Sequence, residues 1–240
     1  MLEVADLTVR RGSKTVVSGV GLAAERGKVL AVLGANGAGK SELVLAMAGM
    51  LPVQSGEVNV DGRSIRGLAP DQIRKAGIAA VPEGHRVLTQ LSVEDNLRAA
   101  ASILPAGQVD AALSDVYELF PELSERRKQL AGTMSGGQQQ MVAIGHALMS
   151  RPSFLLIDEM SLGLAPLVVK RLAATVRCLK DKGVGIVIVE QFAEVALSLA
   201  DRAMVMRLGK VAFNGPAEQL RMSPEALHAA YFEGTSTGGR

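Results

Sequence analysis

The chain has 240 residues, 48% of them hydrophobic, and a formal net charge of only +2, so it can bury a sizeable core and is not predicted to be disordered. Aromatic residues make up 3% of the chain and tryptophan is absent, which argues against a surface that stacks nucleic-acid bases. Cys178 is the only cysteine, which excludes an intrachain disulfide and is compatible with a reducing cytoplasm.

The first third of the chain predicts mainly strands. Residues 2–9 alternate apolar and polar side chains, which indicates an edge strand, and residues 15–25 indicate a strand pair. Residues 28–34 form a compact apolar run and predict a buried strand, after which residues 40–50 have the composition of a helix. One further strand is predicted within residues 55–65, bounded by turns at Ser55-Gly56 and Asp61-Gly62, and a second buried strand is predicted at residues 76–82.

The rest of the chain is richer in helices. Residues 92–149 are mainly helical in character, and Ser92 is predicted to cap the first of these helices. Two buried strands, at residues 153–159 and 183–190, flank a helix at residues 166–183. Because strands and helices alternate, we expect a parallel, doubly wound sheet with the helix-rich stretch as an inserted subdomain. No apolar run approaches the ~20 residues that span a bilayer, so membrane association is expected to go through a partner.

Residues 34–41, "GANGAGKS", match the pattern G-x-x-x-x-G-K-[ST] between a predicted strand and a predicted helix. Glycines let backbone N–H groups wrap phosphate oxygens, and the helix amino terminus adds a partial positive charge. Lys40 is expected to reach the β- and γ-phosphates, and the Ser41 hydroxyl to ligate Mg²⁺. The alternative, a glycine-rich turn with an incidental lysine, is disfavoured by the strand and helix on either side. The remaining nucleotide-binding residues predicted in this loop are Gly34, Ala35, Asn36, Gly37, Ala38 and Gly39.

Two adjacent acids end the buried strand "FLLIDE", residues 154–159. Asp158 is suited to hold Mg²⁺ directly or through water, and Glu159 to polarise an attacking water as a general base. By itself this pattern also fits a solvated acidic turn. The phosphate-binding pattern earlier in the chain favours the functional interpretation.

A third motif, "TMSGGQQQ", spans residues 133–140. Ser135 is a plausible helix cap, and the two glycines that follow cost a helix about 1 kcal/mol each relative to alanine. A helix start that tolerates this loss presents bare amides to an anion. Taken alone, the motif fits an ordinary Ser-capped helix equally well.

With these three motifs in this order, the chain resembles the nucleotide-binding subunit of ATP-binding cassette (ABC) transporters over essentially its whole length. "GANGAGKS" is similar to the Walker A loop, "MSGGQQQ" to the family signature and "FLLIDE" to Walker B. The resemblance implies an α/β P-loop NTPase with a RecA-like parallel-sheet core, an N-terminal antiparallel β subdomain and an inserted helical subdomain. It places one domain at residues 1–235, the helical subdomain at about 84–149 and a disordered tail at 236–240.

The resemblance also implies ATP and Mg²⁺ as cofactors and a head-to-tail dimer of two ATP-binding subunits. Each ATP then lies between the Walker A loop of one subunit and the signature of the other. The residues that would contact the nucleotide in trans are Ser135, Gly136, Gly137 and Gln138.

Longer phrases such as "VPEGHRV", "LSVEDNL", "SLGLAP" and "AAYFEG" resemble the branched-chain amino acid importer subgroup. This implies an ATPase that energises an importer from the cytoplasmic side of the inner membrane of a bacterial or archaeal cell. Its partners would be integral-membrane permeases, a second ATP-binding subunit that is identical or a paralogue, and indirectly a periplasmic binding protein. Residues 84–130 and the Glu83 loop would face the permease. The resemblance does not fix the cargo.

At several positions the sequence departs from the family pattern. Glu83 replaces a glutamine of many cassettes and is either a Mg²⁺ ligand or a solvated loop acid. Arg11 replaces an aromatic ring that stacks on adenine, and a guanidinium plane can also stack on a base. Gln191 replaces a histidine that senses the γ-phosphate; its amide can hydrogen-bond the phosphate or the attacking water but cannot take a proton near neutral pH. Glu159 therefore stays the favoured base.

Other polar residues receive weaker assignments. Glu190 is expected to be a structural or interface acid. His85 is expected to be a surface histidine, with a role at the subunit contact as the alternative because it lies near Glu83. The histidines have no ligand-like spacing and predict no metal set. Further departures from the family pattern are Glu42, His146 and Met160.

Two other functions stay open. One is a soluble cassette ATPase that acts on nucleic acid, although the sequence shows no twin cassette, zinc module or long coiled-coil insertion. The other is a regulatory cassette in which ATP only clamps a dimer, which an intact Glu159 disfavours.

Overall fold

A six-stranded sheet forms the centre of the protein, for which a computed structural model describes residues 1–232. Its strand order is β10-β9-β3-β8-β7-β6, and all neighbouring strands are parallel except the edge pair β10 and β9. The predicted tail at residues 236–240 lies outside the described residues. The strands are β3 (Val29–Leu33), β6 (Ile78–Val81), β7 (Phe154–Asp158), β8 (Gly185–Val189), β9 (Arg202–Arg207) and β10 (Lys210–Pro216).

The parallel sheet separates two hydrophobic cores, as the residues of β3 show. Val29, Ala31 and Leu33 pack into one core, whereas Leu30 and Val32 pack into the other. Because both faces are covered, β3, β7 and β8 are buried along their whole lengths and read as continuous apolar runs rather than alternating ones.

A second, four-stranded antiparallel sheet has the order β2-β1-β4-β5. Its strands are β1 (Leu2–Arg11), β2 (Lys14–Ala24), β4 (Val53–Val60) and β5 (Arg63–Ser64). The prediction of an edge strand at residues 2–9 is wrong, because β1 pairs with both β2 and β4. Alternation reports one buried face, not the number of neighbouring strands. The predicted strand pair at residues 15–25 is also wrong: Gly19, with φ of 61°, lies at a register shift within the single strand β2.

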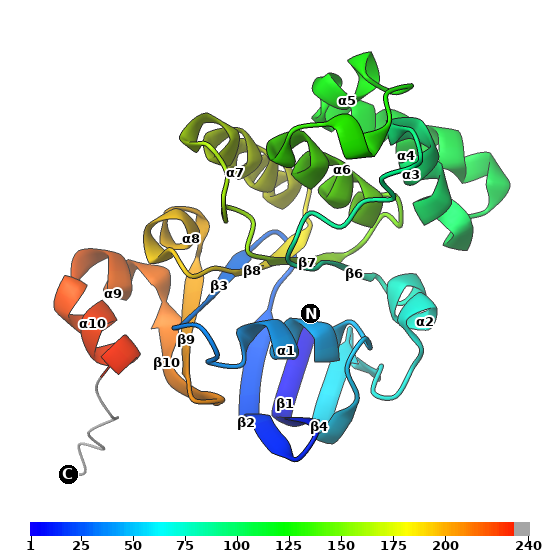
Figure 1. Cartoon of the computed structure of the whole chain (residues 1–240). Helices are drawn as coiled ribbons and strands as arrows, with labels where there is room; N and C mark the ends of the chain where they lie inside the picture. The colour runs from blue at the N-terminus through cyan, green and yellow to red at the C-terminus, as the bar shows by residue number, and fades with distance from the viewer. Residues whose placement is uncertain (233–240) are drawn as a thin grey trace, which may run out of the picture.

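Helices cover both faces of the parallel sheet (Figure 1). The helix α1 (Lys40–Met47) lies between this sheet and the antiparallel one, and its apolar residues belong to the core on that side. Helices α7 (Pro166–Asp181) and α8 (Ala193–Leu199) contribute to the other core. The remaining helices outside the helix-rich stretch are α2 (Pro70–Lys75), α9 (Ala217–Met222) and α10 (Pro224–Phe232).

The helix-rich stretch lies between β6 and β7 in the chain, at the top of Figure 1. Ser92 caps its first helix as predicted, because its hydroxyl accepts a 3.1 Å hydrogen bond from the Asp95 backbone. The exact residue limits of the domain and of this subdomain stay predictions. Among residues 1–232, no helix combines the length and apolarity needed to cross a membrane. The helices of the stretch are α3 (Val93–Ala100), α4 (Ala106–Leu119), α5 (Pro121–Glu125) and α6 (Gly136–Leu148), with short 3-10 turns at Ala101–Ile103 and Ala131–Thr133.

Candidate active site

The loop at residues 34–39 joins the carboxyl end of β3 to the amino end of α1. Gly34, Gly37 and Gly39 have φ values of 143°, 76° and 98°, in the region that favours glycine. Gly39 precedes α1 without any side-chain cap, so the first-turn N–H groups of this helix stay available to an anion. The loop therefore has the backbone geometry of a phosphate cradle.

Close backbone neighbours fix this loop from outside. A Cβ on Gly34 would lie 2.2 Å from the carbonyl oxygen of Met206 in β9, and one on Gly39 would lie 2.4 Å from that of Val16 in β2. Among residues 1–232, no atom lies within 4 Å of such a Cβ on Gly37. The two sheets thus hold the ends of the cradle, while its middle is open.

This difference predicts unequal costs for two alanine substitutions. Gly37→Ala adds only the strain of a positive φ, which costs about 1–2 kcal/mol. Gly39→Ala adds the same strain and a clash with Val16, and is expected to lower the free energy of unfolding by about a further 1–3 kcal/mol. Denaturant unfolding of both variants without nucleotide measures the difference. Equal losses of unfolding free energy in the two variants would show that the backbone of β2 moves aside without a measurable cost.

Lys40 crosses the inside of the loop. Its side chain is buried, and Nζ donates hydrogen bonds to the carbonyl oxygens of Gly34 at 2.7 Å and Ala35 at 3.2 Å. Burial lowers the pKa of Lys40, and the carboxylates of Glu159 and Asp158 oppose that shift. The ammonium group therefore stands between the phosphate cradle and the two acids.

Asp158 ends β7, and Glu159 follows it with φ of 54°. Both are buried, and among the described residues Asp158 Oδ1 and Glu159 Oε2 have no hydrogen-bond partner. Burial raises the pKa of Asp158 to about 6, against a hydrogen bond with Ser41, and burial also raises the pKa of Glu159. Buried carboxylate oxygens without donors are costly, which points to a ligand that supplies positive charge or a proton.

The donor set fits a hard divalent cation. The Ser41 hydroxyl and the Asp158 carboxylate are oxygen ligands of the type that Mg²⁺ prefers. Residues 1–232 contain no group of three or more His, Cys, Asp or Glu side chains suited to holding a metal. A cation here would therefore depend on nucleotide phosphates and water for its other ligands, as Mg²⁺ commonly does.

Glu83 and Gln191 lie at the margin of these acids. Glu83 is exposed, and its charge helps raise the pKa values of Asp158 and Glu159. Gln191 has an exposed side chain, while a hydrogen bond with its backbone lowers the pKa of Glu159. The structure thus shows a backbone contact of Gln191 that sequence reasoning missed. The predicted roles of both side chains toward Mg²⁺ and the γ-phosphate stay predictions.

The signature residues lie at the start of α6. Ser135 and Gln138 form a capping box, in which Ser135 Oγ accepts from the Gln138 backbone at 3.3 Å and Gln138 Oε1 accepts from the Ser135 backbone at 3.1 Å. A Cβ on Gly137 would lie 2.6 Å from a methyl group of Val168 in α7, so this glycine is needed for helix packing. Gly136 is exposed with no such contact closer than 3.7 Å, which leaves its amide accessible.

Four further residues named in the sequence analysis are placed by the structure as follows. His85 is partly exposed, and its Nδ1 lies 2.6 Å from Oε1 of the buried Gln140 in α6, a contact that ties the loop after β6 to the signature helix. Arg11 is 74% exposed and pairs with Glu42 at 3.4 Å, so its predicted contact with adenine stays untested. Met160 is fully buried in the core, and burial lowers the pKa of His146.

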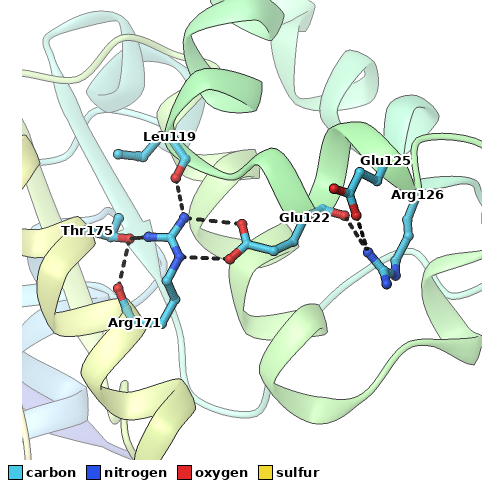
Figure 2. Close-up of polar contacts among 6 residues, drawn as sticks. All are labelled: Leu119, Glu122, Glu125, Arg126, Arg171 and Thr175. Carbon is cyan, nitrogen blue, oxygen red and sulfur yellow. Dashed lines mark hydrogen bonds and ion pairs between the residues drawn. The ribbon is translucent and has the colours of Figure 1, made fainter.

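Figure 2 shows a polar cluster that the sequence did not predict. The guanidinium of Arg171 in α7 binds both carboxylate oxygens of Glu122 in α5, at 2.8 and 3.2 Å, and the carbonyl oxygen of Leu119 in α4 at 2.6 Å. It also donates to Thr175 at 3.0 Å and lies over the ring of Phe120. Since α7 follows the acids of β7, this cluster clamps the helix-rich stretch to the catalytic core.

Removal of the clamp has an expected cost. Arg171→Met should lower the free energy of unfolding by about 1–3 kcal/mol, because the Glu122 carboxylate and the partly buried carbonyl of Leu119 lose their charged donor. Lys170→Met, at the exposed neighbouring position, is the matched control and should change stability by less than about 0.5 kcal/mol. Chemical unfolding of both variants gives the comparison. Equal effects would contradict a clamp at Arg171.

Comparison with known proteins identifies the class of this fold and site. A family model described as ABC transporter matches residues 17–161, which is more than half of the chain, and the chain therefore belongs to the ABC transporter ATP-binding family. It is an ATPase: it binds nucleotide and hydrolyses ATP. The predicted α/β cassette fold, with parallel and antiparallel sheets, is confirmed.

Curated relatives narrow the class. The chain is 39% identical over 229 residues to the high-affinity branched-chain amino acid transport ATP-binding protein BraG of Pseudomonas aeruginosa, covering 95% of this chain and 98% of BraG. It is 36% identical to the probable branched-chain amino acid transport ATP-binding protein LivF of Archaeoglobus fulgidus, covering 82% and 84%. A solved ATP-binding subunit of an ABC transporter, 28% identical, superposes with a TM-score of 0.81 over 92% of both chains. The subgroup resemblance in the sequence is thereby confirmed.

Proposed function

We propose that this ATPase energises an importer of branched-chain or closely related amino acids. The observation that carries the proposal is the 39% identity to BraG over almost the full length of both chains. The geometry of the site agrees with an ATPase, because Lys40, Asp158 and Glu159 converge where a nucleoside triphosphate would bind.

Different residues of this chain have different roles in ATP hydrolysis. Lys40 neutralises charge on the β- and γ-phosphates from inside the cradle. Glu159 accepts the proton of the attacking water, because its burial makes it a stronger base than a solvated carboxylate. The Gln191 amide contacts the γ-phosphate without taking up a proton, and Arg11 stacks against adenine.

Ser41, Asp158 and Glu83 are the residues that would hold Mg²⁺. When bound, Mg²⁺ supplies the positive charge that screens the phosphate oxygens. The buried acids Asp158 and Glu159 support this assignment, because their ionised forms repel each other unless a positive charge lies close by.

A second ATP-binding subunit, identical or a paralogue, completes the site. Ser135, Gly136, Gly137 and Gln138 of one subunit face the γ-phosphate held by the other, in a head-to-tail dimer that ATP closes and hydrolysis reopens. Figure 1 shows α6 in the helix-rich stretch, away from α1, which supports contact in trans rather than within one chain.

The proposed contact with the permease lies at the Glu83 loop and residues 84–130. Leu88, Leu91 and Leu130 are between 38% and 48% exposed, and backbone hydrogen bonds from Leu91 to Leu88 and from Ala131 to Leu91 bring them together. Such an apolar group suits an integral-membrane partner on the cytoplasmic side of the inner membrane of a bacterial or archaeal cell. A periplasmic binding protein would take part only indirectly, and nucleic acid has no role.

Uptake by living cells tests this function. Deletion of the gene in its own host should abolish high-affinity uptake of labelled leucine, isoleucine or valine, and a plasmid copy should restore it. Uptake of labelled lysine is the control and should not change. Normal uptake of all branched-chain amino acids would overturn the cargo, and ATPase activity stimulated by DNA would favour the nucleic-acid alternative.

A further inference from the structure

Glu190 is a buried acid next to the catalytic centre that no step above uses. It follows β8, which lies between β3 and β7 in the sheet, and its side chain is fully buried. Its backbone N–H donates to the carbonyl oxygen of Val32 in β3 at 3.2 Å. The carboxyl group is therefore anchored at the edge of the sheet where the phosphate loop and the two acids of β7 emerge.

Both oxygens of the Glu190 carboxylate accept hydrogen bonds from Ser161, and the Glu190 side chain also shares a hydrogen bond with that of Glu159. Oε1 accepts a 2.9 Å hydrogen bond from the Ser161 backbone, and Oε2 accepts a 2.8 Å hydrogen bond from the Ser161 hydroxyl. Ser161 is buried and lies two residues after Glu159. A carboxylate held in this two-point manner fixes both the position and the direction of the chain that it contacts.

The contact completes a bracket around the proposed base. On the amino side of Glu159, its own backbone N–H donates a 2.9 Å hydrogen bond to the carbonyl oxygen of Val189, the last residue of β8. After it, Glu190 holds Ser161. Glu159 itself has φ of 54°, a conformation that a residue with a side chain adopts only when its surroundings enforce it. The two neighbouring residues at the end of β8 supply that enforcement on both sides.

Electrostatics argue against a purely structural acid at this position. Burial raises the pKa of Glu190 to about 7, against the hydrogen bonds from Ser161, and the charge of Glu159 raises it further. The charged side chains that face Glu190 are Glu159 and Lys40. Perturbed acids of this kind concentrate at functional sites.

We propose that Glu190 is a positioning residue for ATP hydrolysis, which holds the Ser161 turn so that the carboxylate of Glu159 faces the attacking water. The inference rests on the proposed role of Glu159 as the base. It assigns to Glu190 no contact with the nucleotide, so that its loss affects the chemical step and leaves the phosphate cradle intact.

Three variants of the full-length chain test the inference. Glu190→Met keeps the length of the side chain and removes both acceptors. It should lower kcat about a hundredfold, the effect of misplacing a catalytic group by about 1 Å, with unchanged affinity for ATP. Glu190→Gln keeps one acceptor for the Ser161 backbone and should recover most of kcat. Ser161→Ala removes only the hydroxyl contact and should fall between wild type and Glu190→Met. Glu194→Met, an exposed acid on α8, is the control and should behave as wild type.

Other outcomes overturn the inference. If Glu190→Met has a wild-type kcat while Glu159→Gln is inactive, the positioning role of Glu190 is refuted and the proposed base stands. If Glu159→Gln is active, the proposed base is refuted, and the inference about Glu190 fails with it. A parallel loss of ATP affinity and kcat in Glu190→Met, without rescue in Glu190→Gln, shows a structural role only. If Glu190→Met does not unfold cooperatively, Ser161→Ala decides, because a wild-type kcat in that variant contradicts the bracket.

Discussion

Glu159→Gln is expected to bind ATP with wild-type affinity and to hydrolyse it about a hundred to ten thousand times more slowly, the range that general bases contribute. The amide has the shape of the carboxylate and fits the same buried position, so the turn at φ of 54° keeps its conformation. It cannot accept the proton of water. Because Lys40 and the glycine cradle are unchanged, the nucleotide contacts survive.

Release of inorganic phosphate at saturating Mg²⁺-ATP measures this effect, and binding of ATP is measured on the same preparations. Glu118→Gln, an exposed position on α4, is the matched control for the loss of one negative charge. Turnover near that of the wild type would move the role of base to another group, with Asp158 as the nearest candidate.

Lys40→Met is expected to remove binding of ATP almost entirely. The ammonium group is the one buried cation beside the cradle among the described residues, and methionine fills a similar volume without charge or donors. The neighbouring acids Asp158 and Glu159 then repel the phosphates without the opposing charge of Lys40. Loss of binding, rather than loss of turnover alone, distinguishes this variant from Glu159→Gln.

The unfolding temperature with and without Mg²⁺-ATP gives the readout. A ligand at about 100 times its Kd stabilises the native state by about 2.7 kcal/mol, so the wild type should show a clear upward shift and Lys40→Met none. Lys182→Met, at the exposed end of α7, should shift as the wild type does. An undiminished shift in Lys40→Met would show that the backbone amides of the cradle suffice for binding.

Contacts between near neighbours in the sequence were predictable, and contacts between distant residues were not. The phosphate loop, the paired acids of β7 and the Ser135 cap each depend on a few consecutive residues, whose spacing is visible in the sequence. The position of β1 between two partners depends on strands far along the chain, which alternation does not encode. The sequence of a helix or strand shows which of its faces is buried, but it does not show which other element packs against that face.

The polar contacts missed by sequence reasoning have the same cause. His85 binds Gln140 across 55 residues, Glu190 binds Ser161 across 29 and Arg171 binds Glu122 across 49. In each case the sequence shows an unremarkable charged or polar side chain. For Glu190 alone, the sequence holds a signal that could have indicated burial, because this acid directly follows a fully apolar strand.

The contacts that hold the phosphate loop from outside have a consequence for binding kinetics. Since β9 and β2 press against Gly34 and Gly39, the two ends of the cradle are held in place before any ligand arrives. The entropy of ordering the loop is lost during folding rather than during association, which raises affinity without any added contact. Association with ATP should therefore approach a diffusional encounter at the cradle. In the proposed dimer, we expect the slow steps of the cycle to be movements between subunits.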